Sequence, residues 1–194
     1  KENCPIYSLL GMKKTNPKIA YASVLFGKTP QDTFNITKKL KQNNFKAIKL
    51  GWENFGLDLK NDQEHLVAAR DAIGNELELM IDVGAIWGTN IEDAEKRLEI
   101  FQNAKITWLE EPFFSDAFYE YSELYKKTNL PLAGGESCHS IESAKNMIRF
   151  GKVKFIQIDA GIAGGILAGK EICDFAESHD VQYVNHTFTS HLQL

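Results

Sequence analysis

Three apolar segments of the sequence each end at or just before an acidic residue: Asp82, Glu110 and Glu136. Buried strands are expected to shed charge, because burying a carboxylate without a partner costs free energy. Acids that recur at the ends of successive strands therefore indicate one shared site. Carboxylate oxygens suit Mg²⁺, and no Cys/His cluster competes for zinc. We predict that these three carboxylates bind Mg²⁺.

A second acid, Glu111, directly follows Glu110 and precedes Pro112. Side chains alternate along a strand, so Glu111 points away from the direction that Glu110 takes. We therefore expect Glu111 to support the ligands or the substrate from a neighbouring position. Pro112 ends the strand and turns the chain into the next loop.

Lys49 ends another predicted strand, between Ile48 and Leu50. A lysine at the mouth of a barrel can stabilise an anionic substrate, or carry a proton if its pKa is lowered. The alternative is a lysine whose apolar stem is buried while its ammonium group reaches solvent. The neighbouring acids favour a catalytic role for Lys49.

Asp159 and His186 end the last two predicted strands. Adjacent strand ends place the two side chains within hydrogen-bonding reach. An aspartate that accepts from one ring nitrogen fixes the tautomer and raises the basicity of the other nitrogen. We predict His186 as a general base and Asp159 as the residue that orients it. A lone histidine would more often be structural, but the aspartate and the three acids favour function here.

These residues lie on a repeating pattern of strands and helices. The predicted strands are residues 19–26, 45–50, 78–83, 106–110, 130–135, 155–159 and 181–185. The predicted helices are residues 30–42, 62–73, 91–104, 117–127, 140–150 and 165–178. Strands that alternate with helices form parallel sheets. The polar strand ends recur every 23 to 33 residues, which favours a TIM-type barrel over a doubly wound sheet and places the site at the C-terminal strand ends.

Residues 1–17 are polar and rich in turn-forming residues, and we predict that they are a linker entering the domain. Residues 18–194 are then an incomplete α/β barrel, because only seven strands are predicted and a barrel needs closure. The sequence is therefore expected to be a fragment of a longer polypeptide. The missing strand would leave two open sheet edges.

The composition excludes several classes of protein. The 194 residues are 43% apolar and 25% charged, with a net charge of −4, so nothing suggests a nucleic-acid partner. No apolar run reaches the roughly 18 residues of a membrane span. Cys4, Cys138 and Cys173 lack CxxC spacing and are interpreted as free thiols of a reducing compartment, which predicts a cytoplasmic protein.

The sequence resembles the mandelate racemase branch of the enolase superfamily, which includes the muconate lactonizing enzymes. The motifs that carry the resemblance are Lys49, Asp82, Trp108-Leu109-Glu110-Glu111-Pro112, Gly135-Glu136, Gln157-Ile158-Asp159, Gly164-Gly165-Ile166 and Asn185-His186. The resemblance implies a modified (β/α)7β barrel, an α+β capping domain that selects the substrate, and homo-oligomers. It also implies Mg²⁺ on the three acids and removal of the proton next to a substrate carboxylate, with the metal holding the enediolate.

Two departures from the family motifs discriminate between reactions. The family's Lys-x-Lys motif has Ala47 at its first position, and the Asp-x-Asn motif has Gly84 in place of Asn. Racemisation needs bases on both faces of the enediolate, whereas one base, His186, suffices for dehydration. We therefore predict a lyase that dehydrates a sugar acid of the aldonate type. A racemase or epimerase, and a non-catalytic barrel kept for binding or assembly, are the alternatives.

Overall fold

The chain forms a single curled sheet of parallel strands with its helices on the outer side. The computed structural model describes residues 3–15 and 17–187. The strands are β1 (Ala22–Leu25), β2 (Ala47–Gly51), β3 (Glu78–Asp82), β4 (Trp108–Glu110), β5 (Leu132–Gly134), β6 (Phe155–Asp159) and β7 (Gln182–His186). All pairs are parallel and the strand order is the order of the chain. Every strand predicted from the sequence is present.

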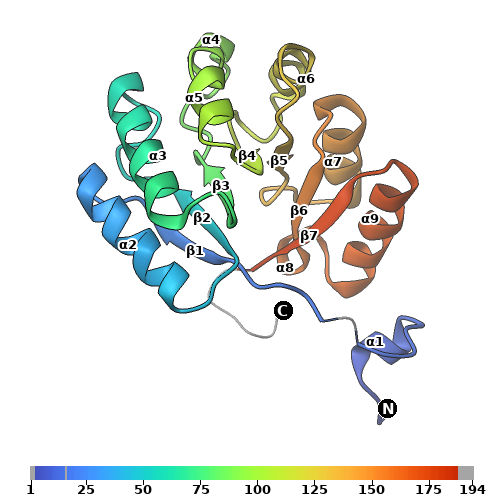
Figure 1. The fold of residues 1–194 in the computed structure, drawn as a ribbon. Helices are drawn as coiled ribbons and strands as arrows, with labels where there is room; N and C mark the ends of the chain where they lie inside the picture. The colour runs from blue at the N-terminus through green and yellow to red at the C-terminus, as the bar shows by residue number, and fades with distance from the viewer. Residues whose placement is uncertain (1–2, 16, 188–194) are drawn as a thin grey trace.

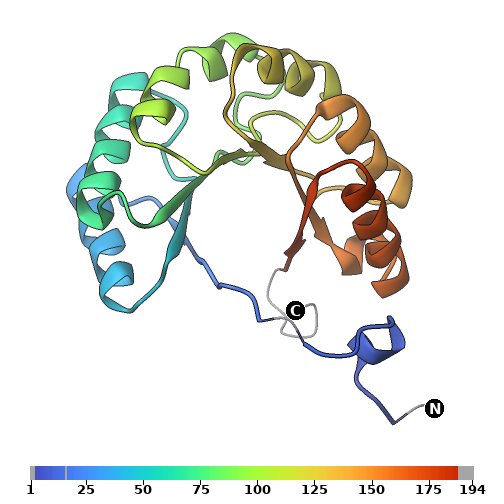
Figure 2. The ribbon, with the colours of Figure 1, turned by 45° about the vertical axis from the view of Figure 1, so that its right-hand side comes forward.

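The helices are α1 (Ile6–Leu9), α2 (Pro30–Gln42), α3 (Leu59–Ile73), α4 (Ile91–Glu95), α5 (Leu98–Asn103), α6 (Phe118–Lys127), α7 (Ile141–Asn146), α8 (Ala160–Ala163) and α9 (Ile166–Ser178), and a π-helix, η1 (Met147–Gly151), continues α7. Helices α2 to α7 and α9 cover the convex face of the sheet, whereas α1 lies apart from it near the N-terminus (Figures 1 and 2). Thr29 and Asp32 form a capping box at the start of α2, with Pro30 in its first turn.

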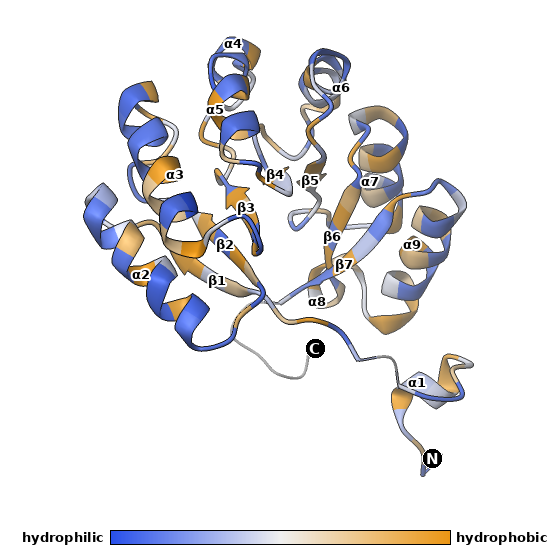
Figure 3. Ribbon diagram, viewed as in Figure 1, coloured by the Kyte–Doolittle hydropathy of each residue, from blue (hydrophilic) through white to orange (hydrophobic). Residues whose placement is uncertain are grey.

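The two faces of the sheet have different environments. Ile48 and Leu50 belong to the large apolar cluster shared with the helices. A small separate cluster contains Met80, Trp108 and Ala133. Because side chains alternate along a strand, this second cluster lies on the concave face, which the helices do not cover. In Figure 3, β2 and β3 are mainly hydrophobic, whereas the helices carry both hydrophilic and hydrophobic residues.

The sheet is an incomplete TIM-type barrel. Figure 2 shows that it curls into an arc whose ends, β1 and β7, are separated by a gap. Within the described residues, β1 and β7 each pair with one neighbour. This agrees with the predicted α/β barrel of seven strands. No helix of the described part is long and apolar enough to cross a membrane.

Some predicted boundaries differ from the structure. The helix predicted over residues 91–104 is two helices, α4 and α5, with Arg97 at the junction. Arg97 leaves the helical path because its guanidinium turns inward, where Nε donates to Asp62 at 2.7 Å. Helix α8 was not predicted; Asp159 caps it by accepting from the backbone N–H groups of Gly161 and Ile162.

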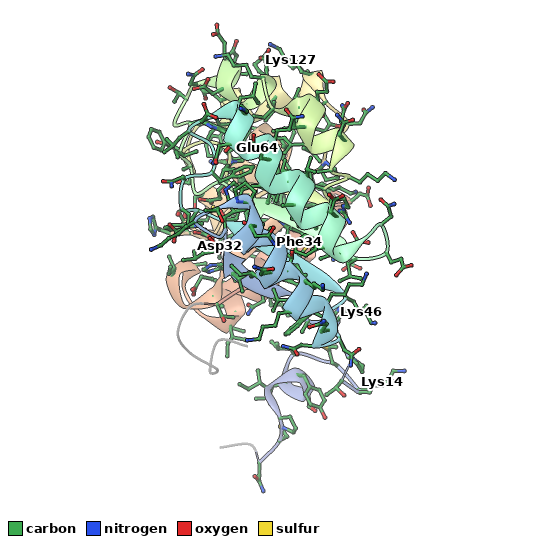
Figure 4. The ribbon with its side chains drawn as sticks, turned by 60° about the vertical axis from the view of Figure 1, so that its left-hand side comes forward. Lys14, Asp32, Phe34, Lys46, Glu64 and Lys127 are labelled. Atoms are coloured by element: carbon green, nitrogen blue, oxygen red, sulfur yellow. The ribbon has the colours of Figure 1, made fainter. Side chains whose placement is uncertain are left out.

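The outer surface is polar and charged. Figure 4 shows α2 and α3 side by side, with Asp32, Glu64 and Lys46 labelled on this surface. Cys4, Cys138 and Cys173 are free thiols, as predicted.

Arg70 of α3 ties together chain segments at the end of the barrel opposite the strand C-termini. Its guanidinium donates to the backbone oxygens of Gly74 (2.7 Å), Leu77 (2.9 Å), Ala104 (2.8 Å) and Lys105 (3.1 Å). These oxygens belong to the ends of α3 and α5 and the entry to β3. Helix ends leave such groups without helical partners, so Arg70 replaces the missing donors.

We expect Arg70→Met to lower the free energy of unfolding by about 2 to 4 kcal/mol, because several partly buried carbonyls lose a charged donor. Thermal unfolding monitored by circular dichroism measures this. Lys39→Met, on the exposed side of α2, is the matched control. Equal midpoints for the two variants would contradict the role of Arg70.

His65 is buried between α2 and the sheet. Its Nδ1 lies 2.7 Å from the Thr33 hydroxyl, and its ring packs edge-on against Phe26. Burial lowers the pKa of His65, and the nearby charges of Asp62 and Glu64 oppose this only in part. The unfolded chain therefore takes up this proton at a higher pH than the folded protein does.

We expect the stability that neutral His65 provides to be complete above about pH 6.5 and to fall as the pH drops below it. Denaturant unfolding of the protein and of His65→Gln, between about pH 8 and pH 5, tests this. The variant should show a shallower loss of stability on acidification. If the free energy of unfolding fell equally with pH in both proteins, a group other than His65 would be responsible for the loss of stability in acid.

Candidate active site at the strand ends

The strand register brings the predicted site residues to one edge of the sheet. Asp82 pairs with Gly51 on one side and Glu110 on the other, and Asp159 pairs with His186. All strands run in the same direction, so their C-terminal ends share the mouth of the incomplete barrel. The site therefore combines residues that are far apart in the sequence.

Lys49 lies on the concave face between two of the predicted metal ligands. Its Nζ is 3.2 Å from Asp82 Oδ2 and donates a short hydrogen bond to Glu110 Oε1. Burial acts to lower the pKa of Lys49. The charges of Glu110 and Asp82 act in the opposite direction and outweigh burial, so the pKa of Lys49 lies above its ordinary value. Lys49 is thus held as a cation. The raised pKa favours the cationic form of Lys49 in this structure, and its two predicted roles, carrying a proton and contacting an anionic substrate, stay predictions.

Glu110 is fully buried, and both of its oxygens are engaged. Oε1 accepts from Lys49, and Oε2 accepts from the indole Nε1 of Trp108 at 2.9 Å. Burial raises the pKa of Glu110, while Lys49 and a hydrogen bond from Gln157 oppose the rise. Because N–H groups point at both oxygens, the ionised form suits this environment.

His186 lies between two carboxylates. Its Nε2 is 3.2 Å from Glu136 Oε2, and its Nδ1 is 3.5 Å from Asp159 Oδ2. The second separation is that of an ion pair, and Nδ1 makes no hydrogen bond in the described part of the chain. The predicted His186–Asp159 neighbourhood is therefore present, without the predicted hydrogen bond. The contact with Glu136 was not foreseen.

Gly51, rather than Ala47, is the position that leaves the mouth end of β2 without a side chain. Ala47 pairs with Glu78 at the start of the two strands and packs with the inner cluster. Alternation places Ala47, Lys49 and Gly51 on the same face. A Cβ at Gly51 would lie 2.9 Å from the backbone oxygen of Asp82. Gly51, and not Ala47, therefore lies beside Asp82 at the mouth, while the assignment of Ala47 to the family motif stays a prediction.

Glu111 takes a different course from Glu110, as predicted. Its φ of +43° lies in the left-handed region, which a glutamate adopts only at a cost. The side chain is buried, and its Oε1 accepts from the backbone N–H of Gly135 at 3.3 Å. Burial raises the pKa of Glu111 to about 8, and repulsion from Glu136 adds to the rise.

The three predicted metal ligands are near one another but are not gathered as a ligand group. Across residues 3–15 and 17–187, no cluster of three or more His, Cys, Asp or Glu side chains is arranged to hold a metal ion. Other side chains contact these acids instead, since Lys49 joins Asp82 to Glu110 while His186 contacts Glu136.

The chemistry of the donors fits Mg²⁺ even so. Burial raises the pKa of both Glu110 and Glu136, and repulsion from Asp82 adds to the rise in each case. The amide oxygen of Gln157, also buried, has no hydrogen-bond partner in the described residues. Hard oxygen donors of this kind suit a divalent cation or its bound water.

Sequence reasoning assigned no role to Gln157 or to the indole N–H of Trp108. Each lies two residues before a predicted site residue, Asp159 and Glu110 respectively. Side chains two residues apart on a strand lie on the same face. Counting back two residues from Asp159 and Glu110 could therefore have found both residues. Tyr21 also belongs to this layer, with its ring 5.9 Å from Lys49 Nζ.

The fold and the site define a class of protein: an incomplete parallel α/β barrel with an acidic site at the C-terminal ends of its strands. The chain belongs to the enolase C-terminal domain-like family, whose sequence model matches residues 35–194. It falls in the mandelate racemase branch of the enolase superfamily, which confirms the resemblance found in the sequence.

Three relatives illustrate the range of this family. The crystal structure of a predicted mandelate racemase from Rhodobacter sphaeroides superposes with a TM-score of 0.91 at 39% identity, covering 96% of this chain and 48% of that one. D-galactonate dehydratase from Verminephrobacter eiseniae is 29% identical over 94% of this chain and 48% of its own length. L-talarate/galactarate dehydratase from Salmonella typhimurium is 28% identical over 94% and 45%. This chain thus spans about half the length of these relatives.

We expect Lys49→Met to lower the thermal midpoint in EDTA, because it leaves Asp82 and Glu110 without their shared cation; breaking a buried pair costs about 3 to 5 kcal/mol. Added MgCl₂ should then raise the midpoint more in the variant than in the parent, since an ion that binds the folded state stabilises it. Lys60→Met, at an exposed pair with Glu64, is the control. An equal response to MgCl₂ in all three proteins would rule out the three carboxylates as a Mg²⁺ site.

Proposed function

We propose that the full protein dehydrates a sugar acid by removing the proton next to its carboxylate. The observation that carries this proposal is the one-sided arrangement of the mouth. His186 and Asp159 lie on β7 and β6, whereas the mouth end of β2 offers Gly51 and a lysine that two carboxylates hold as a cation. A single candidate base suits dehydration better than inversion.

Each residue has a distinct part in the proposed reaction. Mg²⁺, when bound by Asp82, Glu110 and Glu136, supplies positive charge for the substrate carboxylate and for the charge that proton removal creates. His186 Nε2 takes the proton from C2. The C3–O bond then breaks, and the hydroxyl leaves as water with a proton that His186 returns. The enol that remains becomes a 2-keto-3-deoxy acid.

The carboxylates position the base and the substrate. Asp159 faces Nδ1 of His186, which leaves Nε2 as the nitrogen for substrate. Glu136 contacts Nε2, so engaging Glu136 elsewhere would release that nitrogen for the C2 proton. Lys49 adds a buried positive charge near the position of the substrate carboxylate.

A racemase or epimerase is the second candidate, favoured by the 39% identity to a protein described as a predicted mandelate racemase. A non-catalytic barrel is the third. The reaction products distinguish these three candidate functions. We expect a panel of sugar acids, incubated with the full-length protein and Mg²⁺, to yield 2-keto-3-deoxy acids detected as semicarbazones. Inversion at C2 without loss of water would establish the racemase instead, and no chemical change with any acid would favour the non-catalytic barrel.

We expect His186→Asn to lower kcat by at least about 100-fold, the scale of general acid–base catalysis. The MgCl₂-dependent rise of the thermal midpoint should be unchanged in this variant, because the metal ligands stay. His179→Asn, at the exposed end of α9, is the matched control and should retain activity. Parental kcat in His186→Asn would remove His186 as the base.

We also propose that a second domain covers the mouth, in the place of the predicted capping domain. Large apolar side chains are exposed in the segments that follow several strands, namely those of Trp52, Ile86 and Phe114 in loops, Ile162 in α8 and Leu167 in α9. Exposed apolar surface of this extent marks an interaction site. The division at residue 17, the cytoplasmic location and the homo-oligomer stay predictions.

A further inference from the structure

Two consecutive residues of the loop after β2 have a left-handed backbone. Trp52 has a φ of +65° and Glu53 a φ of +57°, although neither is a glycine. Such conformations cost free energy and persist only where the surrounding structure holds them. The residue before this turn is Gly51, which ends β2 and pairs with Asp82. The strained turn therefore lies directly beside a proposed metal ligand.

Buried polar contacts hold the other end of this loop. The backbone oxygen of Gly56 accepts from Trp87 Nε1 and from Arg97 Nη2, each at 2.9 Å. The N–H of Gly56 donates to Asp62 Oδ1 at 2.8 Å. Arg97 and Asp62 also form an almost completely buried ion pair at 2.7 Å. The loop is thus fixed by β2 at one end and by these contacts at the other, which offsets the cost of its left-handed turn.

The loop places the indole of Trp52 against Gly84, in the loop after β3. An added Cβ on Gly84 would lie 3.3 Å from Cε2, 3.5 Å from Nε1 and 3.6 Å from Cδ2 of the indole. The ring therefore fills the space in which a side chain at position 84 would begin. Gly84 is also one of the two departures from the family motifs. Trp52 remains 58% exposed, so packing in the core does not account for its position.

Gly84 connects Trp52 to Asp82. The N–H of Gly84 donates to Asp82 Oδ1 at 3.0 Å, and the N–H of Trp52 donates to the backbone oxygen of Asp82 at 3.3 Å. Trp52 thus contacts the main chain of Asp82 and also the residue that holds one of its carboxylate oxygens. Hydrogen bonds of this kind orient the side chains that bind a metal ion.

Gly84 needs a neighbour to hold this oxygen firmly. Its φ is +55°, and a glycine loses more conformational freedom than any other residue when its backbone is fixed. The indole of Trp52 restricts Gly84 from the side on which other residues carry a Cβ. Restriction before binding lowers the cost of ordering a site when its ligand arrives.

We propose that Trp52 is a positioning residue that acts through Gly84 to fix the Asp82 carboxylate in the orientation that binds Mg²⁺. This inference deepens the proposed function and rests on its Mg²⁺ site. Trp52 takes no part in proton transfer or in breaking the C3–O bond. Its contribution is to the affinity for Mg²⁺.

Calorimetric titration of the full-length protein with MgCl₂, in the absence of substrate, measures this affinity directly. We expect Trp52→Ala to raise the Kd for Mg²⁺ by about tenfold, the lower end of the range for groups that orient metal ligands. Trp52→Phe should restore most of the affinity, because a phenyl ring can also contact Gly84.

Phe114→Ala is the matched control. Phe114 is 54% exposed, and its ring lies against Gly88, where an added Cβ would be 3.1 Å away. It therefore packs on a glycine of the same loop as Gly84 does, and it belongs with Trp52 to the apolar surface proposed to face a second domain. Because Gly88 is not bonded to the Asp82 carboxylate, Phe114→Ala should leave the Kd for Mg²⁺ unchanged.

A double-mutant cycle tests the route through Gly84. Gly84→Asn is suitable because asparagine tolerates a left-handed backbone better than most residues do. In the parent the new side chain meets the indole, so the Kd should rise. In Trp52→Ala the same change meets no ring, and the rise should be at least about threefold smaller, as expected for residues in contact.

The outcomes separate this inference from the function on which it rests. An equal Kd in Trp52→Ala and the parent, or an equal rise in Trp52→Ala and Phe114→Ala, would overturn the positioning role while the Mg²⁺ site stands. Additive changes of log Kd in the cycle would overturn the route through Gly84. Absence of Mg²⁺ binding by the parent would overturn the Mg²⁺ site and this inference together. Mg²⁺ binding without dehydration of any sugar acid would overturn only the proposed reaction.

Discussion

Buried negative charge on the concave face of the sheet is the constraint on which the rest of the site depends. Lys49 contacts both Asp82 and Glu110, and all three side chains are almost completely buried. Two carboxylates so close together would repel each other and lose hydration without a cation between them. Lys49 is that cation in this structure, and His186 contacts Glu136. The same need for positive charge makes the mouth a candidate site for a divalent cation.

This constraint also limits the chemistry that the site can perform. Two carboxylates contact Lys49 and raise its pKa, which favours a charged lysine over a basic one in this structure. The remaining candidate base is His186, on the far side of the mouth, where Asp159 and Glu136 face its two nitrogens. Carboxylates of the mouth thus contact both the proposed base and the buried lysine.

Particular residues show why sequence patterns located some features and missed others. Helix 30–42 was predicted with its observed bounds, because Thr29, Pro30 and Asp32 are local signals. The helix predicted over 91–104 is broken, because Arg97 turns toward Asp62, which is 35 residues away. Apolar periodicity contains no information about such a partner. Likewise, alternation identified the face of β2 that bears Lys49, but the paired strand β3 was needed to show that Gly51, and not Ala47, lies beside Asp82.

The sequence by itself determined the order of strands and helices, the parallel sheet, the family, and the residues Lys49, Asp82, Glu110, Glu136, Asp159 and His186 at its strand ends. These follow from patterns of period 2 and 3.6 and from the cost of burying charge, which are local properties. The tertiary structure alone decided which side chains touch: Lys49 with two carboxylates, His186 with Glu136, and Glu111 with the backbone of Gly135. Contact between distant residues depends on strand register and on the curvature of the sheet, and both arise only when all the strands pack together.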